Sequence, residues 1–371
     1  MSLSTVNDRL DLVEEMIEYP QLRQDIIALL EQTFDSLRLV TKFTYGRGDA
    51  DDLMELSKTI ITTSAISDTL REHAASRIAV AIDPGMAAPE TRRRQCISVL
   101  DRRFDLAQPR ELAQRIQNAI DEDGLSEYHR MEDEEASEMS DLAQEVLGRE
   151  AGEEDLKSMP KRIQPKPHMI VGSFKRATDG RDDVHIMKRN ASPTLERLHS
   201  SLDSLAEAKV SLEKELRQKL GTDSLVLKWT PNLAHIAHVK GKDAARVTAH
   251  YPKSLSSSKS TRSFQVPEWT QLGAQMDETR FRIRNEEQRV LGKLREQVIH
   301  SLVKLRRNAA VLDELDVACA FAILANEKGY IRPILSAEPL HNIVGGRHPV
   351  VEAGLGEQGR NFAPNDCLLG D

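Results

Sequence analysis

Apolar residues recur at three- and four-residue spacing along most of this chain, a pattern that predicts helices. In the first 120 residues the repeat is carried by Leu10, Val13, Ile17, Leu22, Ile26, Leu29 and Leu30. Asp49 precedes another periodic segment and is followed by two more acids, so we expect a capped helix to begin there. A further helix is expected over about 109–118.

The clearest pattern begins at Pro193. Leucines follow a 3-4-3-7-4 rhythm at Leu195, Leu198, Leu202, Leu205, Leu212 and Leu216. This is a heptad seam of the kind that pairs two helices, with Lys209 at one seam position. Ser192 is suited to cap the helix, Pro193 to occupy its first turn, and Gly221 to end it.

A short β region is expected next. Leu225, Leu227 and Trp229 alternate with polar residues, residues 231–232 read as a turn, and Ile236 lies in a second run. The alternation of Val247, Ala249 and Tyr251 predicts a third strand.

A second long helix is expected from about 278 to 326, where leucines and valines form an apolar stripe. Nearly fifty residues at the helical rise span roughly 70 Å. Gly329 and Pro333 close it. The pattern therefore predicts a mainly α fold, in which a helical body carries a long antiparallel coiled-coil-like arm with a small β-sheet tip.

Composition agrees with long, solvated helices. Of 371 residues, 39% are hydrophobic and 30% charged, but only 4% are aromatic, which disfavours an all-β fold. The net charge of −8 is unevenly distributed, because residues 121–155 alone carry −13 and leave a mildly basic remainder. We expect much of 121–182 to be disordered.

Compartment signals are few. Three widely spaced cysteines, Cys96, Cys319 and Cys367, form no CxxC pair, which favours a reducing intracellular compartment. No apolar run reaches membrane-spanning length, and no signal peptide is apparent, so no membrane partner is expected.

The predicted tip is basic. Residues 240–262 contain one acid, Asp243, and six cationic residues: Lys240, Lys242, Arg246, Lys253, Lys259 and Arg262. Binding of backbone phosphates requires mainly well-placed cations. These six residues are therefore candidates for sequence-independent contact with double-stranded DNA. The alternative, that this is simply a solvated polar loop, stays open on composition alone.

Two phosphate-loop resemblances fail. The run 257–261 contains Lys259 but lacks the glycine before it, and Gly46-Arg47-Gly48 lacks a third glycine and the strand-to-helix context. His235 and His238 are three apart in a predicted strand, so they face opposite sides and make a poor joint metal site. No metal and no catalytic set is predicted.

The end of the chain has its own signature. An extended run with Gly345 and Gly346 leads into Arg347-His348-Pro349, and a second short run follows at 367–369. These features predict the opening strands of an α/β unit, and the chain stops at Asp371 with no phosphate loop after them. Because Pro349 fixes the turn, a structural role for His348 is favoured over a ligand or base.

Several blocks together resemble the MutS family of DNA mismatch-repair proteins. The strongest lie near the C-terminus, and weaker ones lie at the start of the returning helix and near the N-terminus. They are 315–318, 330–333, 346–352, 362–366, Arg280-Phe281, 8–13 and 35–39.

The resemblance implies a lever domain over 1–120, an acidic insert over 121–182, and a clamp over 183–277. It further implies a return helix over 278–335 and the first residues of a truncated ATPase domain over 336–371. The implied partners are double-stranded DNA and a homo- or heterodimer of MutS-type subunits. ATP and magnesium would be bound by the intact protein, and no cofactor is expected to be bound by these residues. The resemblance also implies that, in the intact protein, the state of the ATPase domain is coupled to opening of the clamp.

Two departures qualify the resemblance. Relatives carry basic clamp residues just before Arg280, whereas 271–277 here holds no cation. The acidic insert, with 46–50 and 227–231, resembles a eukaryotic branch, so a mitochondrial or nuclear location is expected, the mitochondrial one slightly favoured. The alternatives are a structural coiled-coil assembly protein without DNA binding, and a standalone enzyme using His348.

Overall fold

The computed structural model describes residues 2–80, 96–150, 184–248, 250–251, 253–258, 260–338 and 340–369. The chain divides into two compact units. Unit 1 comprises Met1–Thr33, Thr62–Leu106 and Arg306–Asp371, and unit 2 comprises Phe34–Ile61 and Ala107–Leu305. The fold is mainly α with a small antiparallel sheet, as the sequence predicts.

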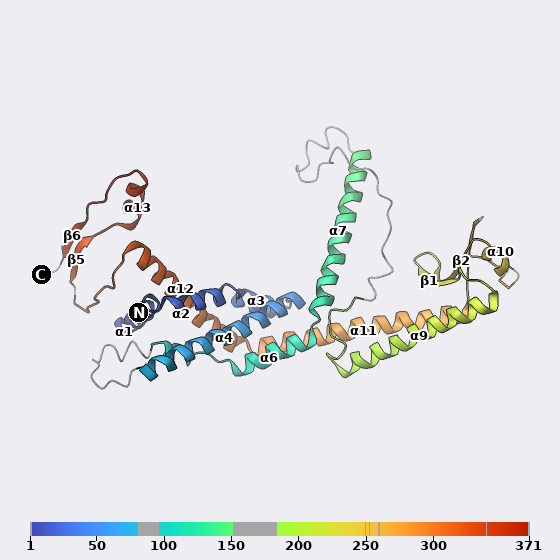
Figure 1. Ribbon diagram of the computed structural model, residues 1–371, viewed down its shortest axis with the longest axis horizontal. Coiled ribbons are helices and arrows are strands. Elements are labelled where there is room, and N and C mark those ends of the chain that lie inside the picture. Colours follow the sequence, from blue (N-terminus) through green and yellow to red (C-terminus); the bar gives the residue numbers. More distant parts are fainter. Residues whose placement is uncertain are drawn as a thin grey trace. The chain divides into compact units, whose positions relative to one another are not determined.

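The labelled elements are shown in Figure 1. The helices are α1 (Leu3–Glu18), α2 (Pro20–Leu30), α3 (Ser36–Thr44), α4 (Ala50–Val80), α6 (Ala107–Ala119), α7 (Glu122–Glu150), α9 (Pro193–Leu220), α10 (Asp243–Val247), α11 (Pro267–His300), α12 (Leu302–Lys328) and α13 (Pro349–Glu357). The strands are β1 (Val226–Thr230), β2 (Ala234–Lys240), β3 (Ser256–Ser257), β4 (Thr261–Phe264), β5 (His341–Gly346) and β6 (Asn365–Leu369). Within the described ranges, none of the helices is long and apolar enough to cross a membrane.

Unit 1 is built around a helical core. Its buried side chains come from α1, α2, the second half of α4, residues 97–100 and α12, and include Met16, Ile26, Leu70 and Leu315. The segment after α12 is tied back to α1, because Nη1 of Arg332 lies 2.6 Å from carboxylate oxygens of both Asp11 and Glu14.

The end of unit 1 contains the expected short strands. β5 and β6 pair antiparallel, with α13 between them in the sequence. His348 is the N-cap of α13, and its Nδ1 accepts the Val351 N–H at 3.3 Å. Its contacts are thus those of a helix cap, which agrees with the structural role favoured above.

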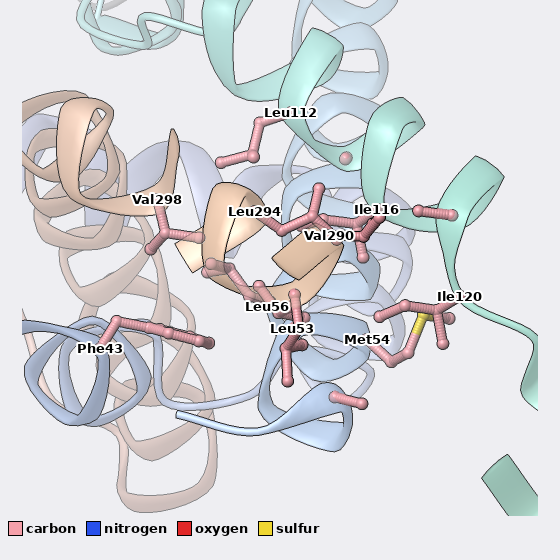
Figure 2. Close-up of a cluster of buried hydrophobic side chains, with 14 of the residues drawn as sticks. Phe43, Leu53, Met54, Leu56, Leu112, Ile116, Ile120, Val290, Leu294 and Val298 are labelled. Carbon is pink, nitrogen blue, oxygen red and sulfur yellow. The ribbon is translucent and has the colours of Figure 1, made fainter. Parts of the chain in front are cut away.

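Unit 2 has two hydrophobic clusters, and Figure 2 shows the larger one. Phe43, Leu53, Ile116 and Leu294 bring α3, α4, α6 and α11 together. Helix α4 begins as predicted, because Asp49 Oδ1 accepts the Asp52 N–H at 2.8 Å and Asp52 Oδ2 accepts the Asp49 N–H at 3.2 Å.

Helices α9 and α11 form the arm of unit 2 and lie side by side (Figure 1). The start of α9 shares a cluster with Ile283 and Val290, whereas its end shares another with Trp269 and Met276, so the two helices run antiparallel. Ser192 Oγ accepts the Leu195 N–H, and Gly221 ends α9 with a φ of +60°. Both predicted ends are confirmed.

The returning helix differs from the prediction. It begins at Pro267 rather than near 278, and it ends at His300. Ser301, with φ −91° and ψ 0°, separates it from α12, so two helices replace one. The leucine stripe continues across Ser301, which is why periodicity alone does not reveal the break.

The acidic segment also differs from the expected disorder. Residues 122–150 form α7, while 151–183 lie outside the described residues. Two acids occupy the first turn of α7, where the helix dipole favours them, and Arg130 pairs with Glu127 and with Glu134, the latter at 2.7 Å. Buried Leu125 anchors the helix base in the larger cluster.

Candidate nucleic-acid interface

A four-stranded antiparallel sheet at the end of the arm supports the predicted basic residues. Its strand order is β1-β2-β4-β3. Leu227, Ala237 and Phe264 on one face pack with Trp269 and Met276 of α11 in the second cluster. This face is the inner face of the sheet, and the sheet with α10 and its loops is called the tip.

His235 anchors the inner face to α11. Its Nε2 lies 2.8 Å from Asp277 Oδ2, and its ring meets the Trp269 ring edge-on at 5.1 Å. The ring occupies space above Gly273, where any Cβ would lie 2.3 Å from Nδ1. The absence of a side chain at Gly273 therefore allows β2 to approach the helix closely.

The register puts a second set of residues on the opposite, outer face. Val226 pairs with His238, Lys228 with Ile236, and Lys240 with Thr261, so these side chains share one side of the sheet. Lys240 and Val226 are exposed, Lys228 and His238 are half-buried, and Ile236 is buried. The prediction that His235 and His238 face opposite sides of β2 is confirmed.

Cations cluster around His238. Its Nδ1 lies 3.0 Å from Ser263 Oγ. Partial burial lowers the pKa of His238, and the positive charges of Lys228 and Lys240 lower it further. The outer face therefore has a positive field that disfavours a third positive charge and favours an anion.

The six predicted residues divide into three groups. Lys240, Lys242 and Lys253 are exposed. Lys259 lies outside the described residues. The remaining two, Arg246 and Arg262, contact the protein itself.

Arg262 lies on the inner-face side of β4, since it pairs with Val239. Its guanidinium donates to Thr248 Oγ1 and to the Tyr251 carbonyl, each at 2.9 Å, and so holds the loop before β3. Arg246 Nη1 donates to the Gly221 carbonyl at 3.0 Å, although the side chain stays 65% exposed. These contacts give both arginines a structural role in the tip.

Asp243, the one acid of this segment, is also held internally. Its Oδ2 accepts the Ser224 hydroxyl at 2.7 Å and the backbone N–H groups of Asp223 and Ser224. These hydrogen bonds lower the pKa of Asp243 and keep it charged. They tie α10 to the segment before β1.

One predicted strand is wrong and one cation was missed. Val247 ends helix α10 rather than lying in a strand, because it is buried in the tip core, while Tyr251 stacks against Phe264 at 4.6 Å. Lys228 was not among the candidates, since it lies outside the basic run. Its place between inward-facing Leu227 and Trp229 is the signal that could have identified it.

Metal chemistry finds no support in the described residues, where His, Cys, Asp and Glu side chains form no group of three suited to hold an ion. Of the rejected phosphate-loop run, Ser257 ends β3 and Thr261 begins β4. Between them, the Ser258 N–H donates to the Thr261 carbonyl at 2.8 Å.

A helical unit with a long two-helix arm and a small sheet at its end is the architecture expected for the lever and clamp of a mismatch-repair protein. Comparison with known families matches residues 1–322 to MutS domain III, which is most of the chain. The protein therefore belongs to the MutS domain III family.

Individual relatives agree at low identity. The chain is 25% identical over 365 residues to the DNA mismatch repair protein MutS of Bacillus cereus (strain G9842), covering 98% of this chain and 32% of that protein. The MutS protein of Geobacillus kaustophilus is likewise 25% identical over 364 residues, covering 98% and 32%. That of Treponema pallidum (strain Nichols) is 32% identical over 187 residues, covering 50% and 20%. The chain spans about a fifth to a third of the length of these relatives.

Proposed function

We propose that this chain provides the lever and clamp part of a DNA mismatch-repair protein, and that its tip contacts the phosphate backbone of duplex DNA without reading sequence. The observation that carries the proposal is the two-faced sheet. Apolar side chains of the inner face pack on α11, while Lys228 and Lys240 lie on the outer face, with Lys242 exposed next to them.

The charge distribution supports a local rather than a global interaction with DNA. The whole chain carries −8, whereas residues 240–262 carry +5. An acidic protein is attracted to DNA only where cations are concentrated, since charges farther away than about 10 Å are screened at 0.1 M salt. A contact made by the tip fits this requirement.

The arm gives the proposal its mechanical part. Helix α11 runs without interruption over 34 residues from the larger core cluster of unit 2 to the tip. We propose that in the assembled protein this helix carries movements driven by an ATP-binding domain to the tip, and so opens or closes the clamp on DNA. A dimer of MutS-type subunits would then enclose the duplex from two sides.

Fluorescence anisotropy with a labelled duplex, measured at several salt concentrations, tests the DNA contact. The test variant replaces Lys228, Lys240 and Lys242 with Ala. The control replaces three exposed cations away from the tip, Lys58, Lys293 and Arg306, and so has the same net charge.

Wild-type affinity should fall steeply with salt, because cations that bind phosphates release counterions. Removing three phosphate contacts should reduce the slope of log affinity against log salt by about 3. The control should keep the wild-type slope. Absence of binding at low salt would favour an assembly protein without DNA binding, and an equal loss in both variants would refute a role for the tip.

A further inference from the structure

The outer part of helix α7 is open to solvent. In the described residues, every side chain from Glu132 to Ala143 is exposed. The apolar side chains of Met139, Leu142 and Val146 are 62%, 38% and 45% exposed, and their spacing of three and four residues puts them on one side of the helix. Helices in proteins owe most of their stability to the packing of such an apolar side. The outer part of α7 therefore lacks the usual source of helix stability unless a partner covers it.

Charge repulsion adds to this deficit. Residues 132–141 contain six acidic residues and no basic one. Glu134 and Glu138 are four residues apart, and Glu138 and Asp141 are three apart, and at these spacings like charges destabilise a helix. Arg130 pairs with Glu134 at 2.7 Å, but it is one cation against six acids. A partner for this part of α7 must therefore combine apolar side chains with several cations.

The structure places both ends of the connection that follows α7. The chain leaves the helix at Glu150 and re-enters the described residues at Val184, within the same unit. The re-entering segment is held at the base of α7, because the Asp121 N–H donates to the Ile186 carbonyl at 3.0 Å. The connection must therefore cover about 40 Å, the length of the 29 residues of α7, from the far end of the helix back to its base.

This connection carries the residue types that α7 requires. Residues 156–176 lie outside the described residues, and their sequence contains six cationic residues and no acidic one: Lys157, Lys161, Arg162, Lys166, Lys175 and Arg176. The same run contains four apolar residues close together: Met169, Ile170, Val171 and Phe174. A connection of 33 residues (151–183) reaches up to roughly 110 Å, so all of these residues are tethered within reach of α7. Tethering of this kind gives an effective concentration of about 1 mM or more.

We propose that residues 156–176 dock on the outer part of α7. Their cations pair with Glu135, Glu138 and Asp141, and their apolar residues cover the side of the helix that carries Met139. The contact forms within one copy of the chain, because the tether favours it over the same contact with a second copy. It supplies both the packing and the counter-charge that keep this exposed, acidic stretch helical. It does not depend on the contact of the tip with DNA.

Amide hydrogen exchange of the full chain, measured by mass spectrometry at low and high salt, tests the contact on peptides from 132–150. The test variant, Lys161→Gln with Arg162→Gln and Lys166→Gln, removes three cations of the connection. The control, Lys214→Gln with Lys219→Gln and Lys293→Gln, removes three exposed cations from the arm helices α9 and α11. Exchange in peptides from α4 and α11 checks that each variant keeps the rest of its fold.

In the wild type at low salt, the amides of 132–150 should exchange about tenfold or more slowly than in the test variant, because docking suppresses local opening of the helix. The control should exchange like the wild type. High salt should bring the wild type to the rate of the test variant, since it screens the charge pairs. Equal exchange in the wild type and the test variant, or equal acceleration in the control, would overturn the proposal.

A second variant tests whether the cations act on the named acids. Glu135→Gln with Glu138→Gln and Asp141→Asn keeps side-chain size but removes the three charges that the connection is proposed to pair with. In this background the three substitutions in the connection should change the exchange rate less than about twofold, because interacting groups show non-additive effects. An undiminished effect would mean that these cations act elsewhere, and the docking site named here would be wrong.

Cross-linking in a mixture of isotope-labelled and unlabelled chains identifies the occupant of α7. A carbodiimide joins a lysine amine to a carboxylate in contact with it. Cross-links between the lysines of 156–176 and the acids of α7 should therefore join residues that carry the same label. Cross-links between labelled and unlabelled chains would show that a second copy supplies the occupant, and they would overturn docking within one copy, as would the absence of any such cross-link.

Discussion

Replacing Gly273 with Ala is the sharpest test of how the tip is held on the arm. The new Cβ would lie 2.3 to 2.5 Å from three atoms of the His235 ring. The ring has little room to move, because it is 8% exposed and lies between Asp277 and the Trp269 ring. Either β2 must move away from α11, or the His235–Asp277 hydrogen bond must break.

The size of the effect follows from two opposing contributions. Forcing an extra methyl group into a packed interface costs about 1–3 kcal/mol. Ala is about 1 kcal/mol more favourable than Gly inside a helix, which offsets part of that cost. The difference is a net loss of up to about 2 kcal/mol of tip stability.

Intrinsic fluorescence measures this change selectively. The chain has two tryptophans, and both lie in or against the tip: Trp229 on β1, and Trp269 on α11, which is 3% exposed. Urea unfolding followed by tryptophan emission therefore reports on this region, and a Trp229→Phe background isolates Trp269. Circular dichroism in the same samples reports on the helices.

Gly292→Ala is the matched control on the same helix. A Cβ at Gly292 would have nothing within 4 Å, so this change should stabilise the chain by about 0.4–1 kcal/mol through the helix preference of Ala. Gly273→Ala should lower the fluorescence midpoint, and Gly292→Ala should not. If Gly273→Ala leaves the midpoint unchanged or raises it, the close approach of His235 to the helix is not what holds the tip.

Three further predictions concern single contacts. Arg262→Lys keeps the charge but replaces the two guanidinium nitrogens that donate to Thr248 and Tyr251 with a single nitrogen. The tip should therefore lose about 1–2 kcal/mol in the same fluorescence assay, and full wild-type stability would contradict this role. Burial raises the pKa of Glu287 to about 7 from 4.5, so the folded state binds this proton more tightly than the unfolded chain does. The resulting stability is present below pH 4.5 and is lost as pH rises through 7, a change of about 3 kcal/mol. Glu287→Gln should flatten this pH dependence in urea unfolding followed by circular dichroism, and an unaltered profile would count against it. Ser192→Ala removes the cap of α9 and should cost about 1 kcal/mol in thermal unfolding, whereas exposed Ser200→Ala on the same helix should cost less.

The arm could be predicted from sequence because its determinants are local. Ser192 and Gly221 mark the ends of α9 through hydrogen bonding and backbone conformation that depend on a few neighbouring residues. The seam leucines are buried or half-buried as expected. Lys209 is accommodated at its seam position because its Nζ lies 5.3 Å from the centre of the Trp269 ring.

The tip could be predicted only in part, because its contacts join residues distant in the sequence. The orientation of Arg262 depends on the register between β2 and β4, which no local pattern reveals. A basic run therefore shows how many cations are present but not which face each one takes. For this reason Lys228, which was not a candidate, lies on the outer face, whereas the candidate Arg262 lies on the inner face.

The acidic segment shows the limit of composition as a guide. High charge and few aromatic residues are typical of disorder, yet they are equally compatible with a solvated helix whose base is buried. Leu125 and the pairs of Arg130 with Glu127 and Glu134 distinguish the two outcomes over 122–150. These depend on helical spacing and tertiary packing, which composition does not capture.

The attachment of the tip decides what the arm can transmit. Helix α11 holds the sheet through His235, and α9 reaches the same place through Lys209 over Trp269. Because both helices contact the sheet in this way, the sheet must rotate together with them rather than move independently on its connecting loops. Thirty-four residues of α11 extend about 50 Å, so a rotation of about 5° at the base moves the tip by about 4 Å. That displacement exceeds the reach of a hydrogen bond to a phosphate, so a small rotation of the arm is enough to make or break contact with DNA.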